Sequence, residues 1–120
     1  MKLPNKLITF TWKLLHQALP IKEVLNHRGI HYDALYMLCN THIETHNHIF
    51  LHCTFARAAW LGIGINTSFL MESNTNMDIW LSKLIESYED SQSNLETLSM
   101  IITTTLCLWF HRNQVIFEGN

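Results

Sequence analysis

Residues 36–60 read YMLCNTHIETHNHIFLHCTFARAAW and have the most unusual composition in the chain. Four histidines and two cysteines fall between positions 39 and 53. The residues as far as position 46 have no sustained apolar period and therefore predict a loop. Thr45 or Asn47 can cap a helix, and apolar residues recur from there to Trp60. The stretch thus predicts an irregular loop that leads directly into a helix.

The segment upstream of this loop predicts two short helices. Pro4 suits the first turn of a helix, and apolar residues recur at helical spacing from Leu7 to Ala18. Pro20 ends that helix and can open the next one, which Gly29 closes. The loop over residues 30–46 follows.

Two longer amphipathic helices are predicted downstream. A Gly-Ile-Gly run at 62–64 breaks the preceding helix, and the polar and small residues over 64–76 predict a linker loop. Asn76 caps a helix over 77–88, and after a polar turn Asn94 caps the last helix. Because no sustained period-2 pattern occurs, the predicted fold class is all-α.

The same helical spacing predicts which side chains are buried. Aromatic residues at this spacing usually pack inside, so four tryptophans are predicted in the core: Trp12, Trp60, Trp80 and Trp109. Cys107, in an apolar helix, is predicted to be a small core residue, whereas a solvated position is favoured for His42, His46 and His52. Arg112 and Asn113 are predicted to tie the last helix to whatever follows it.

The bulk composition predicts one folded domain. The chain has 120 residues, of which 48% are hydrophobic and 15% charged, and this excludes a disordered tail. So few charges also indicate a segment whose surface was once covered by neighbouring domains.

Charge is divided unevenly between the two halves of the chain. Residues 1–60 carry six basic and three acidic side chains, a net charge of +3, whereas residues 61–120 carry two and seven, a net charge of −5. Any affinity for a phosphate backbone is therefore expected in the first half, and expected to be weak. A solvated face is favoured over a nucleic-acid track for its basic residues: Lys2, Lys6, Lys13, Lys22, Arg28 and Arg57.

The cysteine count and the start of the chain predict an intracellular protein. The chain has three cysteines, and no apolar signal-like region follows Met1. A reducing compartment, nucleus or cytoplasm, is therefore expected, with free or metal-bound thiols. The most apolar stretch, 98–110, is too short to span a membrane, which takes about 20 apolar residues.

The cysteines and histidines of the loop point to zinc. Thiolate and imidazole are the ligands that zinc prefers, and a structural site needs four of them in a tetrahedral arrangement. His48 and Cys53 form an H-x4-C pair that supplies two ligands from about one helical turn. Cys39 lacks the partner of a C-x2-C pair, because Tyr36 occupies that position. The sequence therefore predicts a zinc site that lacks one thiolate.

The spacing of these residues resembles a known family. The pattern is Tyr36-x2-Cys39-x4-Glu44-Thr45-x2-His48-x4-Cys53-x6-Trp60, and it resembles the reverse-transcriptase zinc-binding domain of plant non-LTR (LINE-type) retrotransposon polyproteins. Residues 4–12 and 19–28 resemble the lead-in to that domain. Residues 108–117 resemble the helix that leads into a ribonuclease H domain in such polyproteins.

The resemblance implies a division of the chain and a non-catalytic role. It implies a zinc-binding-like domain over 1–62, a linker over 63–76 and a helical segment over 77–120. The chain as a whole would be small and helical, with a zinc-knuckle-like loop followed by the two longer amphipathic helices. No catalytic residue is carried over, because the family's polymerase and ribonuclease H activities belong to neighbouring domains.

The resemblance also implies the ligands and the cofactor. The family's ligands fall on Cys39, His48 and Cys53, and the cofactor is Zn²⁺ in an incomplete site. Tyrosine rarely binds zinc, because its phenol must lose a proton with a pKa of about 10. His42 and His52 are the substitute ligands nearest in sequence. A complete small site contributes about 10 kcal/mol or more to folding, and one without a thiolate contributes much less.

Three functions are compatible with the sequence. The favoured one is a zinc-knuckle-like module that assists the association of a reverse transcriptase with RNA or DNA, next to flanking reverse transcriptase and ribonuclease H domains. The second is a metal-free structural or interaction remnant of a decayed retroelement. The third is a small zinc hydrolase with Glu44 as general base, which cysteine-rich ligation disfavours.

Overall fold

The computed structural model describes residues 4–29, 35–65, 76–90 and 95–118. Its helices are α1 (Asn5–Leu15), α2 (Lys22–His27), the π-helix η1 (His48–His52), α3 (Thr54–Gly62), α4 (Met77–Asp90) and α5 (Leu95–Glu118). Within these ranges all regular structure is helical, apart from one isolated antiparallel bridge between Leu35 and Ile43. The predicted all-α class is confirmed.

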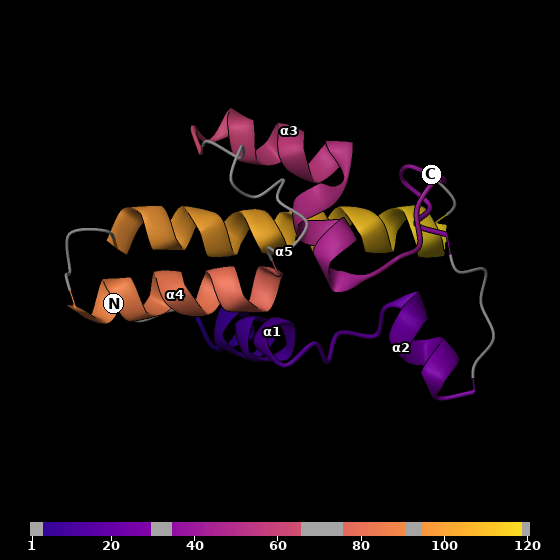
Figure 1. Cartoon of the computed structure of the whole chain (residues 1–120), viewed down its shortest axis with the longest axis horizontal. Helices are drawn as coiled ribbons and strands as arrows, with labels where there is room; N and C mark the ends of the chain where they lie inside the picture. Colours follow the sequence, from indigo (N-terminus) through magenta and orange to yellow (C-terminus); the bar gives the residue numbers. More distant parts are fainter. Residues whose placement is uncertain (1–3, 30–34, 66–75, 91–94, 119–120) are drawn as a thin grey trace.

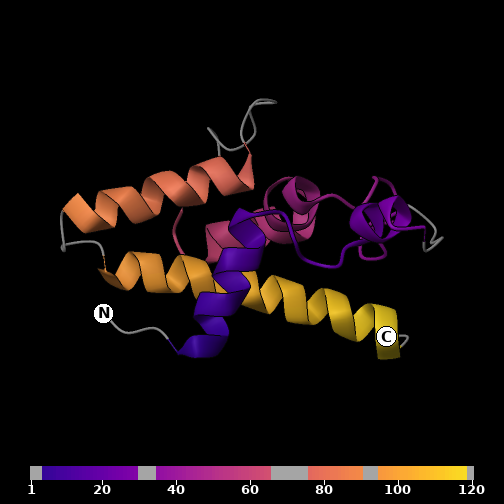
Figure 2. The same ribbon diagram turned by 90° about the horizontal axis from the view of Figure 1, so that it is seen from below.

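The long helix α5 is the element on which the others assemble. It contacts α1, α3, α4 and η1. Figure 1 shows α4 alongside its first half and α3 on the opposite side, and Figure 2 shows α1 crossing it. One face of α5 is buried, and its members recur at helical spacing: Leu98, Ile101, Ile102, Thr105, Leu108, Trp109 and Arg112. Helix α5 therefore connects the predicted zinc loop to the rest of the core.

Among the described residues, one hydrophobic core joins the first and second halves of the chain. The ring of Phe50 lies 6.3 Å from that of Phe10 and 6.5 Å from that of Trp109. Trp60, fully buried, meets Trp80 edge-on at 5.3 Å. Aromatic pairs at such separations add roughly 0.5–1.5 kcal/mol each beyond the burial of their surface.

The predicted helices exist, but one of them is divided. The sequence predicted a continuous helix as far as Trp60, whereas the backbone is extended at Cys53, with φ −65° and ψ 147°. Two helices result, η1 before this residue and α3 after it. Helix α3 ends at Gly62, in the predicted Gly-Ile-Gly run, and Gly64 takes the left-handed φ of 84° that favours glycine.

The start of α4 is capped by a different asparagine from the one predicted. The side-chain oxygen of Asn47 accepts a hydrogen bond of 2.8 Å from the Met77 N–H. Asn76, the predicted cap, instead accepts a bond of 2.9 Å from the Asn47 side-chain amide through its own side-chain oxygen. The predicted cap Asn94 and most of the predicted linker lie outside the described residues, and the predicted turn at 89–94 is helical as far as Asp90.

Two of the burial predictions for apolar residues are wrong. Trp12 is 56% exposed, because it lies away from the buried face of α1, and its ring stacks on that of His16 at 4.3 Å. Cys107 is exposed, since it falls outside the buried face of α5. Trp60 and Trp109 are buried as predicted, and Trp80 is half-buried against the core.

Two predictions of solvated polar residues are also wrong. His46 is buried, and its Nε2 has no hydrogen-bond partner among the described residues. Lys22 is also buried, and its ammonium donates a hydrogen bond of 2.7 Å to the Leu35 carbonyl oxygen.

No described helix is long and apolar enough to cross a membrane.

Candidate metal centre

A tight turn presents the first two candidate ligands. The Leu35–Ile43 bridge closes this turn, and the Tyr36 N–H donates a hydrogen bond of 2.8 Å to the His42 carbonyl oxygen. Asn40 stands at its tip with a φ of 57°, a left-handed conformation that asparagine tolerates better than most residues. Cys39 and His42 therefore come from one turn of the chain.

A turn of π-helix presents His48 and Cys53. Thr45 caps its start, since its hydroxyl accepts a hydrogen bond of 3.1 Å from the His48 N–H. The Cys53 N–H then bonds the His48 carbonyl oxygen at 2.9 Å, which is the i to i+5 pattern of a π-helix. An α-helix would separate two such residues by roughly 140° around its axis. The π turn instead brings both residues of the H-x4-C pair to one side.

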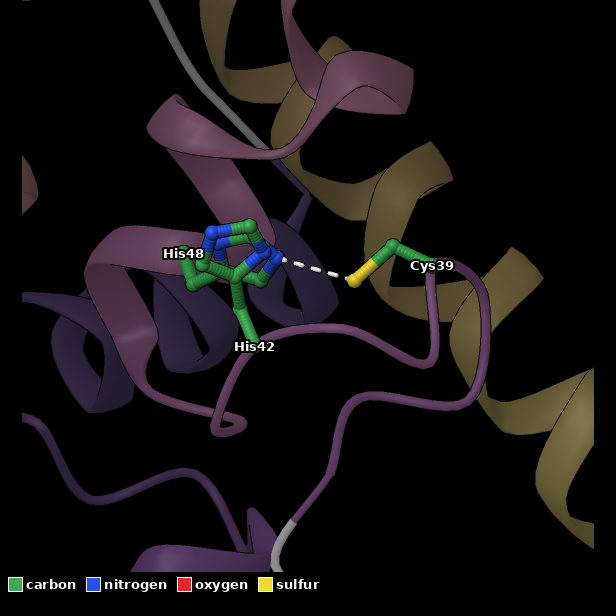
Figure 3. Close-up of side chains that lie close together, drawn as sticks. All are labelled: Cys39, His42 and His48. Carbon is green, nitrogen blue, oxygen red and sulfur yellow. Dashed lines mark hydrogen bonds between the residues drawn. The ribbon is translucent and has the colours of Figure 1, made fainter.

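These two turns bring three candidate ligands together. Figure 3 shows the stacked rings of His42 and His48 beside the sulfur of Cys39. The ring centroids are 4.8 Å apart, and Cys39 Sγ lies 3.2 Å from His48 Nε2. One ligand atom from each of the three residues lies within 4.8 Å of the other two.

The donor set and the spacing fit zinc. At tetrahedral angles, zinc bond lengths separate a sulfur ligand from a nitrogen ligand by roughly 3.5 Å. The observed sulfur–nitrogen distance of 3.2 Å is close to this value. Three donors of this kind fit a zinc site with an incomplete ligand set.

Cys53 and His52 line the same pocket, which has a volume of about 440 Å³. Cys53 is buried, and burial raises the pKa of its thiol. A main-chain hydrogen bond from Phe55 lowers this pKa, and the neighbouring Cys39 raises it. His52 is half-buried and does not belong to the three-residue group. The assignments of Cys53 and His52 as ligands stay predictions.

The thiol of Cys39 is prepared for the form that binds metals. Burial raises its pKa, but hydrogen bonds from Thr41 and from His48 outweigh this, and the pKa is lowered to about 5. Thiolate, not thiol, is the metal-binding form of cysteine. Cys39 is therefore a thiolate at neutral pH before any metal binds.

Tyr36 lies against the site without the properties of a ligand. It is 1% exposed, and its ring meets that of His48 edge-on at 5.6 Å. Burial raises the pKa of its phenol well above the ordinary value. The hydroxyl stays neutral at physiological pH and has no hydrogen-bond partner among the described residues. Tyr36 thus packs the wall of the site.

The structure also gives two residues of the loop contacts that the sequence did not predict. Asn47, next to His48, reaches the start of α4, and Glu44, two residues after His42, meets Arg112 of α5. Both contacts join residues far apart in the chain, so no local spacing could have found them. Arg112, which was predicted to tie the last helix to a following segment, bonds Glu44 of the preceding loop in the described part of the chain.

A family model described as zinc-binding in reverse transcriptase matches residues 1–60, half of the chain. The chain belongs to this family. Comparisons with curated proteins and with solved structures returned no match.

The family match covers the loop that carries the candidate zinc ligands. The family is that of a zinc-binding accessory domain of reverse transcriptase rather than its catalytic part. The Cys39, His42 and His48 group falls inside the matched segment, as do Cys53 and Trp60. Helices α4 and α5 lie outside it.

Proposed function

We propose that this domain holds one zinc ion through Cys39, His42, His48 and Cys53 and helps a reverse transcriptase of plant LINE-type origin to associate with nucleic acid. The observation that carries the proposal is the group of Cys39, His42 and His48 in the matched segment. Tyr36 would stand where the family has its first cysteine, and His42 would replace that ligand. When bound, zinc supplies a fixed cross-link between the turn and the π-helix.

His42 is a better substitute than His52. It belongs to the three-residue group, and the Thr41 hydroxyl lies 2.9 Å from its Nδ1. A hydrogen bond at one ring nitrogen orients an imidazole ligand and leaves the other nitrogen, here Nε2, for the metal. His52 shares the pocket but not the group.

A groove between α1 and α5, with a volume of about 610 Å³, supports the nucleic-acid part of the proposal. Its lining includes Lys6 and Lys13 but no Asp or Glu from the described part of the chain. The ring of Phe110 lies 4.5 Å from the Lys6 ammonium, and Phe117 is 76% exposed. Cationic side chains next to accessible aromatic rings suit the phosphates and bases of a single strand.

We further propose the division of the chain given by its sequence. The zinc-binding domain would take residues 1–62, a linker residues 63–76, and a helical segment leading toward a ribonuclease H domain residues 77–120. The chain would have no catalytic residue of its own, and its partners would be the two flanking enzymatic domains.

Native mass spectrometry of the full chain, refolded with and without Zn²⁺, tests the metal site. We expect one zinc in the wild type and in His52→Ala, and its loss in His42→Ala. His16→Ala, exposed directly after the end of α1, is the matched control and should keep the ion. Zinc bound only after Tyr36→Cys would mean that His42 does not compensate, and the metal-binding proposal would be wrong for the natural sequence.

Fluorescence anisotropy with labelled single-stranded RNA at low salt tests the groove. Reversing both lysines in Lys6→Glu/Lys13→Glu should raise Kd on the order of tenfold, because fewer counterions are released on binding. Lys83→Glu, exposed on α4, is the charge-matched control for each single reversal, Lys6→Glu or Lys13→Glu. If the zinc-loaded wild type does not bind at all, the nucleic-acid role is lost and the zinc site is unaffected.

A further inference from the structure

The carboxylate of Glu44 is completely buried and is held by groups from both halves of the chain. Oε1 accepts a hydrogen bond of 2.7 Å from the Lys22 N–H and one of 2.5 Å from Arg112 Nη2. Oε2 accepts a third bond, of 3.2 Å, from Arg112 Nε. A buried charge is tolerated only when it is paired and hydrogen-bonded in this way.

Arg112 is itself fixed before it reaches Glu44. Only 3% of it is exposed, and its guanidinium lies 4.8 Å from the ring centre of Trp109 on the same helix. Its Nη1 donates a hydrogen bond of 2.9 Å to the side-chain oxygen of Asn113. Helix α5 therefore presents a preorganised, planar fork of donors to the carboxylate.

A second contact fixes the same loop from α4. Asn47 bonds both the Met77 N–H and the Asn76 side chain, as described above. Glu44 lies two residues after His42, and Asn47 lies immediately before His48. The short segment that carries both imidazoles is thus attached at two points to helices outside the family match.

We infer that Arg112 is a positioning residue for the zinc site, and that α4 and α5 support the metal-binding loop from outside the family match. This inference rests on the proposed zinc function. Without Arg112, the Glu44 carboxylate is buried with only the Lys22 N–H, and the loop must open to hydrate it. Opening moves His42 and His48 away from Cys39.

The test is the zinc affinity of the full chain, measured by competition with a chromophoric chelator, together with the visible spectrum of the Co²⁺ form. We expect Arg112→Met to weaken zinc binding about tenfold, at the lower end of the effect of supporting residues around a metal. Arg112→Lys, which keeps the charge but loses the fork, should give an intermediate affinity. Leu98→Ala, near the other end of α5, is the control for destabilisation alone.

The control separates positioning from a general loss of stability. Leu98→Ala should lower Tm while leaving the zinc affinity and the Co²⁺ spectrum close to those of the wild type. Equal loss of affinity in both variants at matched Tm would overturn the inference.

Amide hydrogen exchange on the metal-free chain keeps the inference separate from the zinc proposal. Arg112→Met should remove protection from residues 42–48, and Leu98→Ala should not do so selectively. A wild type that binds no zinc would refute the proposed function, whereas unchanged protection of residues 42–48 in Arg112→Met would refute the positioning role.

Discussion

The main-chain N–H of Cys53 bonds the carbonyl oxygen of His48 at 2.9 Å and closes a π turn between two residues five apart. Within that turn, the carbonyl oxygen of Phe50 accepts a hydrogen bond of 2.8 Å from the indole N–H of Trp60. Helices with this wider pattern are rare and are frequently found at functional sites. The H-x4-C spacing and the tryptophan that follows it therefore belong to one arrangement.

The indole of Trp60 is expected to stabilise this π turn. Trp60→Phe keeps an aromatic ring in the core but leaves the buried Phe50 carbonyl oxygen without its partner. We expect the metal-free chain to lose about 1–3 kcal/mol of unfolding free energy in urea denaturation. Trp12→Phe, at an exposed position, should change it by less than about 0.5 kcal/mol. Equal effects of the two substitutions would mean that the hydrogen bond of the Trp60 indole does not stabilise the π turn.

The helices were predictable because helical periodicity is a local property. The buried face of α5, from Leu98 to Trp109, follows directly from the i, i+3, i+4 recurrence of its residues. Trp12 shows the limit of this reasoning, since it widens the apolar face of α1 in sequence but is exposed, unlike Phe10 and Leu14 of the same helix. Periodicity identifies a face and does not give its width.

The site was predictable in part, because ligand spacing is local and ligand selection is not. Cys39 and His48 were expected together and are 3.2 Å apart. The choice of His42 over His52 as the third member depends on the turn at Asn40, which brings one imidazole back onto the other. The contacts of Glu44 and Asn47 join segments 68 and 30 residues apart, beyond the range of any pattern in the sequence.

The Glu44–Arg112 pair should behave as a coupled unit in stability measurements. Arg112→Met alone is expected to cost about 3–5 kcal/mol, because it leaves a buried carboxylate without its counter-charge. Glu44→Gln/Arg112→Met should cost less than the sum of the two single substitutions, since the neutral amide removes the unpaired charge. Urea denaturation of the four chains measures the coupling. Additive effects would mean that the two side chains do not depend on each other.

Tyr36 provides a test of what replaced the family's cysteine. Tyr36→Phe removes a buried hydroxyl that has no partner among the described residues, so we expect a gain of about 1 kcal/mol in the metal-free chain. Tyr36→Cys should instead cost about 3 kcal/mol without zinc, because it leaves a cavity beside His48. Thermal unfolding with and without Zn²⁺ compares the two. A Tyr36→Phe variant less stable than the wild type would show that the hydroxyl has a partner.

Zinc should protect one cysteine from alkylation while leaving another reactive in the same molecule. Cys39 is a half-buried thiolate in the proposed site, whereas Cys107 is exposed on α5 and far from the pocket in sequence. With free zinc at 100 times Kd, about 1% of the sites are empty, so iodoacetamide should modify Cys39 about 100-fold more slowly. The rate at Cys107 should not change, and a chelator should restore the rate at Cys39. Peptide mass spectrometry of quenched samples measures both rates in one experiment.

In His42→Ala the protection of Cys39 should be lost at the same zinc concentration, because the ion would lack its substitute ligand. Equal rates at Cys39 with and without zinc in the wild type would mean that its thiolate is not a ligand.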